Sequence, residues 1–314
     1  MVTIEKTTLP VWGNCVKLSN GNIELYATID IGPRLIKLNT KGGKNFFCED
    51  TEVTSTFSNE AHKKAFGGKE WRIFGGHRLW VSPENDPASY YPDSEPVAWQ
   101  EIPNGVILTP PPQRFTQLQM EMEVTMSDTE DSIKVTHRVT NQNAYAVEFA
   151  PWALSVMTQG GLEIVPQPKR QTGLLGNRVI ALWPYSDMND KRIYWGTDYI
   201  TLQQIKEIDQ PIKFGINNED GWAAYFANND LFIKTFQHDL NADYPDGGMS
   251  YETYTCPLML EMESIGELKK VQPGETVSHD EVWYLFKDVA EPEHTEEAVH
   301  KILDRSEERR VGKE

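Results

Sequence analysis

Strict alternation of apolar and polar residues in several separate segments is the feature that most constrains the fold of this chain. The clearest examples are Ile23–Ile29, Leu118–Met126 and Ile133–Val139. Successive side chains of a strand point to opposite faces, so each segment predicts a strand with one buried and one polar face. Less regular strand candidates follow along the chain: Leu35–Leu38, Val106–Thr109, Val147–Ala150, Tyr199–Ile205, Trp222–Phe226, Leu231–Phe236, Leu258–Ile265 and Val282–Phe286.

Many short strands separated by turn signals such as Asn20-Gly21 and Asn104-Gly105 predict an all-β antiparallel sandwich or a closed system of sheets. Helix is expected only around residues 59–65 and 295–303. No Gly/Ser-rich linker and no internal repeat of 20 to 50 residues divides the chain. We therefore expect a single domain over residues 1–304.

Residues 305–314 stand apart from the rest of the chain. Their sequence, RSEERRVGKE, resembles the in-frame translation of a common sequencing-adapter oligonucleotide. We expect a non-native tail that carries no part of the fold. The alternative is a genuine charged tail.

The acidic composition restricts the kinds of partner. A formal net charge of −17 argues against a nucleic-acid groove or an anionic membrane surface and favours a neutral or cationic ligand. The chain has no run of 18 apolar residues and no apolar leader, so we expect a cytoplasmic protein. Its three cysteines and seven histidines lack the spacing of a disulfide framework or zinc site. We expect no metal and no cofactor, although Asp243 and Asp246 leave a calcium site open.

The stretch Cys48–Pro96 is rich in Gly, Pro, Trp and Tyr and has weak periodicity, which predicts a long irregular segment of functional importance. It contains two flat aromatic platforms, two titratable groups and two donor forks: Trp71, Trp80, His77, Glu84, Arg72 and Arg78. Sugars pack their C–H faces on aromatic rings and need charged or amide partners for their hydroxyls. The mixture predicts a carbohydrate pocket; the alternative is a loop whose tryptophans cover the core.

Two late carboxylates, Glu261 and Glu263, lie two positions apart in a predicted strand and therefore share one face. If that face is enclosed, the paired like charges raise at least one pKa; the alternative is a solvated face. Arg34 and Lys213 are further candidates for binding hydroxyls or a carboxylate, and His238 for the rim of a pocket. For these three the alternatives are surface positions, ion pairs or a surface turn.

Several landmarks resemble those of the galactose mutarotase-like superfamily, most closely an uncharacterised bacterial branch of it. They are Asp30-Ile-Gly-Pro-Arg-Leu-Ile36, Gly75-Gly-His-Arg-Leu-Trp-x-x-Pro-Glu84, Leu260-Glu-Met-Glu-Ser264, Pro273-Gly-Glu275 and Glu281-Val-Trp-Tyr-Leu285. They span most of the chain, from about Asp30 to Phe286. The resemblance implies a large antiparallel β-supersandwich that binds a small-molecule sugar on a concave sheet face.

In the epimerases of that superfamily a histidine protonates the ring oxygen and a glutamate takes the proton of the anomeric hydroxyl. By position, His77 resembles the first family histidine, and Glu263 or Glu261 resembles the glutamate. Trp152 stands where the second histidine would be. The resemblance implies an aldose epimerase, and we expect His77 and Glu263 to face one another across the same sugar pocket. The alternative is a non-catalytic carbohydrate-binding protein.

Overall fold

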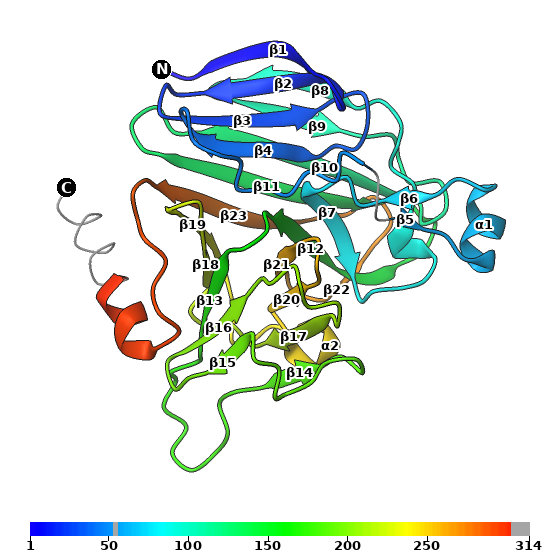
Figure 1. Cartoon of the computed structure of the whole chain (residues 1–314). Coiled ribbons are helices and arrows are strands. Elements are labelled where there is room, and N and C mark those ends of the chain that lie inside the picture. Colours follow the sequence, from blue (N-terminus) through cyan, green and yellow to red (C-terminus); the bar gives the residue numbers. More distant parts are fainter. Residues whose placement is uncertain (53–55, 303–314) are drawn as a thin grey trace.

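The computed structural model describes residues 1–52 and 56–302, and two large antiparallel sheets form most of it (Figure 1). The predicted all-β supersandwich is confirmed. The expected tail, residues 305–314, lies outside the described residues. Within the described ranges, no helix is both long and apolar enough to cross a membrane.

The first sheet contains 11 strands. They are β1 (Thr3–Leu9), β2 (Gly13–Ser19), β3 (Ile23–Thr28), β4 (Leu35–Thr40), β7 (Gly76–Ser82), β12 (Val147–Met157), β14 (Ile180–Leu182), β17 (Ile212–Ile216), β20 (Tyr251–Thr255), β21 (Leu260–Ile265) and β22 (Lys269–Val271). Their order is β1-β2-β3-β4-β7-β12-β21-β20-β17-β14, and β22 pairs with β12. Strand β7 falls inside the stretch that was expected to be irregular, so that expectation is wrong for its central part.

The second sheet contains 10 strands. They are β8 (Ala98–Ile102), β9 (Gly105–Thr109), β10 (Leu118–Met126), β11 (Ser132–Asn141), β13 (Leu162–Pro166), β15 (Ile193–Trp195), β16 (Tyr199–Gln203), β18 (Trp222–Ala227), β19 (Asp230–Phe236) and β23 (Thr276–Phe286). Their order is β15-β16-β13-β18-β19-β23-β11-β10-β9-β8. Every second residue of β10 is buried, as its alternating sequence predicts.

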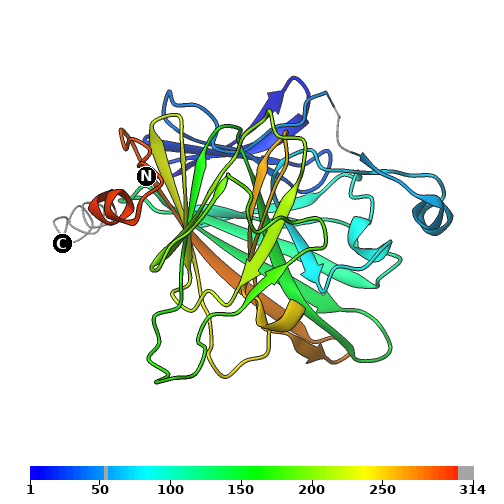
Figure 2. The same cartoon turned by 60° about the horizontal axis from the view of Figure 1, so that its bottom comes forward.

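The remaining elements are short. They are the two-stranded sheet of β5 (Thr56–Phe57) and β6 (Trp71–Arg72), helices α1 (Glu60–Phe66) and α2 (Pro245–Gly248), the 3-10 turn η1 (Ala88–Tyr90), and a helix over 296–302. Asn59 caps α1 by accepting a hydrogen bond from the backbone N–H of His62, and Gly67 ends the helix with a φ of 64°. Figure 2 shows α1 standing out at one side of the sheets.

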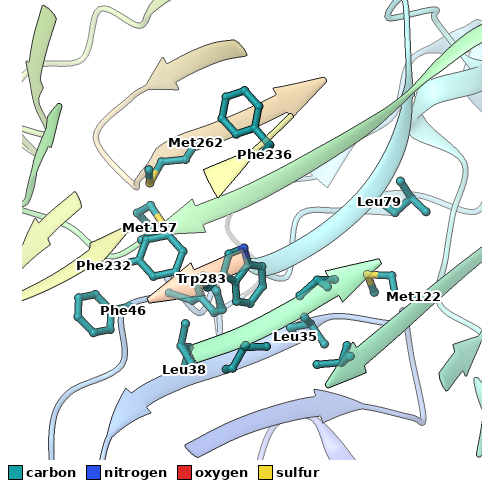
Figure 3. Packing of buried hydrophobic residues seen from close by; sticks show 14 of the residues in the cluster. Leu35, Leu38, Phe46, Leu79, Met122, Met157, Phe232, Phe236, Met262 and Trp283 are labelled. Atoms are coloured by element: carbon teal, nitrogen blue, oxygen red, sulfur yellow. The ribbon is translucent and has the colours of Figure 1, made fainter. Parts of the chain in front are cut away.

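The main core lies between the two sheets (Figure 3). Leu79 of β7 and Met262 of β21 belong to the same buried cluster as Phe232 of β19 and Trp283 of β23. Burying one such side chain stabilises the fold by about 1.5–3 kcal/mol. This packing accounts for only one face of the first sheet.

The opposite face of the first sheet is also covered at its centre. Every residue of β21 is buried, and a second apolar cluster includes Trp80, Trp152, Leu154 and Ile265. These residues alternate along their strands with members of the main core, so they point away from the second sheet. The candidate site is built on this outer face.

Candidate functional site

A cleft of about 500 Å³ opens on the outer face of the first sheet. Its lining combines aromatic rings with charged groups: Thr56, Phe57, Trp71, Ile73, Arg78, Trp80, Glu84, Tyr90, Trp152, Leu154, Trp183, Tyr185, Pro211, Lys213, Tyr254, Met259, Glu261 and Glu263. We refer to this hollow as the cleft. Its size falls within the range of small-molecule sites.

Strand register explains why these side chains converge. Leu154 of β12 pairs with Arg78 of β7 on one side and with Glu263 of β21 on the other. Residues directly opposite each other across a ladder share a face, so all three point to the same side of the sheet. By the same rule Glu252 of β20, which pairs with Glu263, lies on this side as well.

Lys213 is at the centre of a buried ion cluster, which we define as Lys213, Glu252 and Glu263. Its ammonium Nζ lies 2.8 Å from Glu252 Oε2 and 2.9 Å from Glu263 Oε2. The indole rings of Trp152 and Trp183 flank the ammonium, each with its ring centroid 4.7 Å from Nζ. Trp152 also donates its indole N–H to Glu263 Oε2 over 3.0 Å.

Burial and charge act in opposite directions on the carboxyl groups of this cluster. Burial raises the pKa of Glu263 to about 7 and that of Glu252 to about 8, although Lys213 offsets part of each shift. Burial alone would lower the pKa of Lys213, but the charges of Glu263 and Glu252 outweigh it and hold that pKa above its usual value. Near neutral pH, Lys213 is therefore charged, and the two carboxyls are only partly ionised.

A second ion pair lies beside this cluster. Arg78 Nη2 is 2.9 Å from Glu261 Oε1, and both side chains are nearly inaccessible to solvent. The guanidinium lies over the rings of Trp80 and Trp71, 4.5 and 5.4 Å from their centroids. Arg78 Nε and Nη1 are buried without a hydrogen-bond partner among the described residues, and so is Glu263 Oε1. The cleft thus offers both unused donors and an unused acceptor.

Most of the residues singled out in the sequence meet in the cleft. They are Trp71, Arg78, Trp80, Glu84, Trp152, Lys213, Glu261 and Glu263. Glu84 accepts a hydrogen bond from the phenolic O–H of Tyr90, which also lines the cleft.

The expectation that His77 faces Glu263 is wrong. His77 precedes Arg78 on β7, and because strand side chains alternate, its imidazole points into the core between the sheets. There, completely buried, His77 Nδ1 is 2.8 Å from Ser155 Oγ and Nε2 is 2.7 Å from His137 Nε2. Burial, with the neighbouring His137, lowers the pKa of His77 well below its usual value, so the ring stays neutral.

Arg34 and His238 also lie outside the cleft. Arg34 is buried in an ion pair with Asp93, next to a separate cavity of about 40 Å³. His238 Nδ1 is 2.8 Å from Ser250 Oγ, and its ring stacks on Tyr244 with the centroids 4.8 Å apart. Each side chain has a partner within the fold, and for Arg34 it is the ion pair given as the alternative.

Several cleft residues were not anticipated from the sequence. Trp183, Tyr185 and Tyr254 line the cleft, and Glu252 supports it from behind Lys213. Burial raises the pKa of Tyr185 and of Tyr254 above the usual tyrosine value, so both phenols keep their protons. The alternating run Tyr251-Glu-Thr-Tyr-Thr255 was the signal available for Glu252, because β-branched and aromatic residues favour a strand there.

One group of side chains between the sheets has the composition of a metal site. His77, His137 and Glu281 each offer one ligand atom, and these atoms lie within 4.8 Å of one another. Lys234 Nζ is already 2.9 Å from Glu281 Oε1, and it holds the pKa of Glu281 below its usual range despite burial. A cation here would meet the charge of Lys234. We call these four residues the inner network and regard it as structural.

Comparison with known proteins shows which solved structures have a similar fold. No protein-family model and no curated protein matches the sequence. Among solved structures, a putative aldose 1-epimerase from Klebsiella pneumoniae superposes with a TM-score of 0.57 at 11% identity, covering 97% of this chain and 86% of that one. A galactose mutarotase-like protein from Clostridium acetobutylicum gives 0.52 at 8% identity, covering 91% and 99%.

A TPR-domain containing protein from Parabacteroides distasonis also superposes with a TM-score of 0.57, at 12% identity over 87% of this chain. This chain spans only about half of that protein, 47% of its length. Identities this low establish architecture and leave function open. The two sheets described above have the galactose mutarotase-like fold.

Proposed function

We propose that this protein binds a sugar in the cleft. The observation that carries the proposal is that two residues lining the cleft hold buried polar atoms without a partner among the described residues: the donors Arg78 Nε and Nη1 and the acceptor Glu263 Oε1. A buried polar atom without a partner costs about 1–3 kcal/mol. A sugar hydroxyl both donates and accepts, so adjacent hydroxyls on one ring relieve both deficits.

The aromatic walls support the same ligand class. Trp71, Trp80, Trp152 and Trp183 line a cleft that also contains the phenols of three tyrosines. The C–H faces of a pyranose pack against such rings, while charged groups between the rings orient the hydroxyls. The resemblance to sugar-acting epimerases and the mutarotase-like fold agree with this proposal.

Mutarotation is the second candidate function, and Glu263 is the observation that favours it. A carboxyl group with a pKa of about 7 can accept the anomeric proton near neutral pH. The proton donor is less evident, because His77 lies on the other face and the described cleft lining contains no imidazole. Lys213, Tyr185 and Tyr254 all have raised pKa values, which makes them weak acids. Binding without turnover is therefore the function that the geometry favours.

Titration with D-glucose and D-galactose, followed by tryptophan fluorescence and ligand-observed NMR, tests the proposal. We expect Arg78→Met and Trp80→Ala to weaken binding at least about tenfold, which is about 1.4 kcal/mol. Arg138→Met is the matched control, because Arg138 forms its ion pairs with Glu121 and Glu123 on the other sheet. Equal loss in the control, or no binding of any sugar, would contradict the proposal. Exchange NMR on the same samples detects anomerisation, and turnover abolished by Glu263→Gln would establish catalysis.

A further inference from the structure

The charged groups of the cleft do not balance. Three carboxylates, Glu252, Glu261 and Glu263, stand against two cations, Arg78 and Lys213. Glu84 adds a further carboxylate where Tyr90 lines the cleft. The site therefore has an excess of negative charge when its carboxyls are ionised, in a chain whose net charge is already −17.

The charge of each cation is already balanced by carboxylates of the site. Arg78 lies 2.9 Å from Glu261, while Lys213 lies within 2.9 Å of both Glu252 and Glu263. An anionic group can accept hydrogen bonds from Arg78 Nε and Nη1 without separating the pair with Glu261, but it then brings a further negative charge beside Glu261 and Glu263. Like charges repel strongly in a buried site, so a phosphate or carboxylate on the sugar opposes binding.

Two observations point to a cation instead. Glu263 Oε1 has no hydrogen-bond donor although the side chain is completely buried and lines the cleft. The aromatic walls also accommodate positive charge, since Arg78 already lies over Trp80 and Lys213 lies between Trp152 and Trp183. An ammonium group supplies donors for Glu263 Oε1 and is attracted by neighbouring ring faces.

We propose that the cleft selects sugars carrying a protonated amino group over matched neutral sugars, and neutral sugars over anionic ones. This inference rests on the proposed function. It identifies the ligand class of the same site as amino sugars. The ammonium lies against Glu263 Oε1, and the remaining hydroxyls accept hydrogen bonds from Arg78 Nε and Nη1.

A panel of matched sugars at pH 7.5, above the pKa of Glu263, tests the order. It compares D-glucosamine with N-acetyl-D-glucosamine, D-glucose and D-glucuronate, and the four galacto-configured counterparts, by titration calorimetry. We expect the amine to bind at least about tenfold more tightly than the N-acetyl and neutral sugars in one configuration, and the uronate to bind most weakly. Equal affinities for amine and neutral sugar, or tightest binding of the uronate, would overturn this inference and leave sugar binding intact. Failure of every sugar to bind would instead contradict the proposed function.

The variant Glu263→Gln tests whether Glu263 causes the preference for amino sugars. The substitution keeps the shape and removes the charge, so the ratio of amine to neutral affinity should fall toward one, whatever the absolute affinities become. Glu297→Gln is the control, because it removes the same charge from a side chain that is 81% exposed and outside the cleft. A preference that persists in Glu263→Gln would refute the assignment. The panel with the unaltered protein remains decisive if this variant fails to fold.

Discussion

Replacing Lys213 with methionine tests the ion cluster directly. The ammonium of Lys213 is within 2.9 Å of Glu252 and Glu263, and all three side chains are at most 7% exposed. Methionine keeps the apolar stem between the two tryptophans but leaves two buried carboxyl groups without their cation. Removing one partner of a buried ion pair typically costs about 3–5 kcal/mol.

Proton uptake by the two carboxyl groups limits how much stability the variant loses. A buried carboxyl that must stay protonated costs about 1.36 kcal/mol for each pH unit above its ordinary pKa near 4.3, which is about 4 kcal/mol at pH 7.5 and about 1 kcal/mol at pH 5. The unaltered protein already carries part of this cost, because burial raises the pKa of Glu263 to about 7 and of Glu252 to about 8. We therefore expect Lys213→Met to lower the free energy of unfolding by about 3 kcal/mol at pH 7.5.

The sign of the pH dependence follows from the raised pKa values. The folded variant binds more protons than the unfolded chain above pH about 4.3, so its stability falls as pH rises and recovers on acidification. Urea unfolding at pH 7.5 and pH 5.0 should show the deficit narrowing by about 1 kcal/mol at the lower pH, because in the unaltered protein only Glu263, with a pKa of about 7, ionises substantially between the two. Lys206→Met, at a side chain that is 66% exposed, is the control. A loss below about 1 kcal/mol at pH 7.5, or one that grows at pH 5.0, would refute the reasoning.

Four further predictions concern other parts of the molecule. His77→Gln should lower the free energy of unfolding by about 2 kcal/mol without changing sugar affinity, and a selective loss of affinity in titrations would contradict its placement in the core. Burial lowers the pKa of His279 to about 4, so the unfolded chain takes up protons first. The free energy of unfolding measured in urea should therefore fall by up to about 3 kcal/mol between pH 6.5 and pH 4, and by less in His279→Gln. Equal losses in the two proteins would show that His279 is not the cause. Exhaustive chelation should leave the melting temperature and sugar binding unchanged, whereas a drop restored by zinc would identify a metal at His77, His137 and Glu281. Deleting residues 305–314 should leave the melting temperature unchanged, and a decrease of several degrees would show that they belong to the fold.

The sequence predicts strands best where one face is buried and the other is polar. β10 coincides with the predicted segment Leu118–Met126 because its side chains alternate between buried and half-buried positions. The signal weakens in the central strands of the first sheet, where the core covers one face and the cleft residues cover the other. Every residue of β21 is buried, and so are four of the five residues of β20. Strand β20 was missed for this reason, and Glu252 was missed with it.

The candidate site shows the same dependence on strand register. Glu261 and Glu263 were expected to share a face because both lie in a predicted strand, and they meet Arg78 and Lys213 in the cleft. The segment around His77 was instead expected to be irregular, so no face could be assigned to it. Once β7 is recognised as a strand, a shift of one position along it moves a side chain from the core to the cleft.

His77 and Arg78 are neighbours in sequence, yet they belong to polar groups on opposite sides of one sheet. In the inner network both ring nitrogens of His77 have partners, and Lys234 binds Glu281 and the backbone carbonyl of Met262. In the cleft, Arg78 Nε and Nη1 and Glu263 Oε1 have none. Both groups are buried and rich in charge, so neither burial nor residue type distinguishes them. A network whose hydrogen bonds are complete has nothing left to offer a ligand, whereas unpaired atoms in residues that line an open cleft retain a cost that a bound ligand relieves. This difference in hydrogen-bond completion is the physical reason to place the binding function with Arg78 and the structural function with His77.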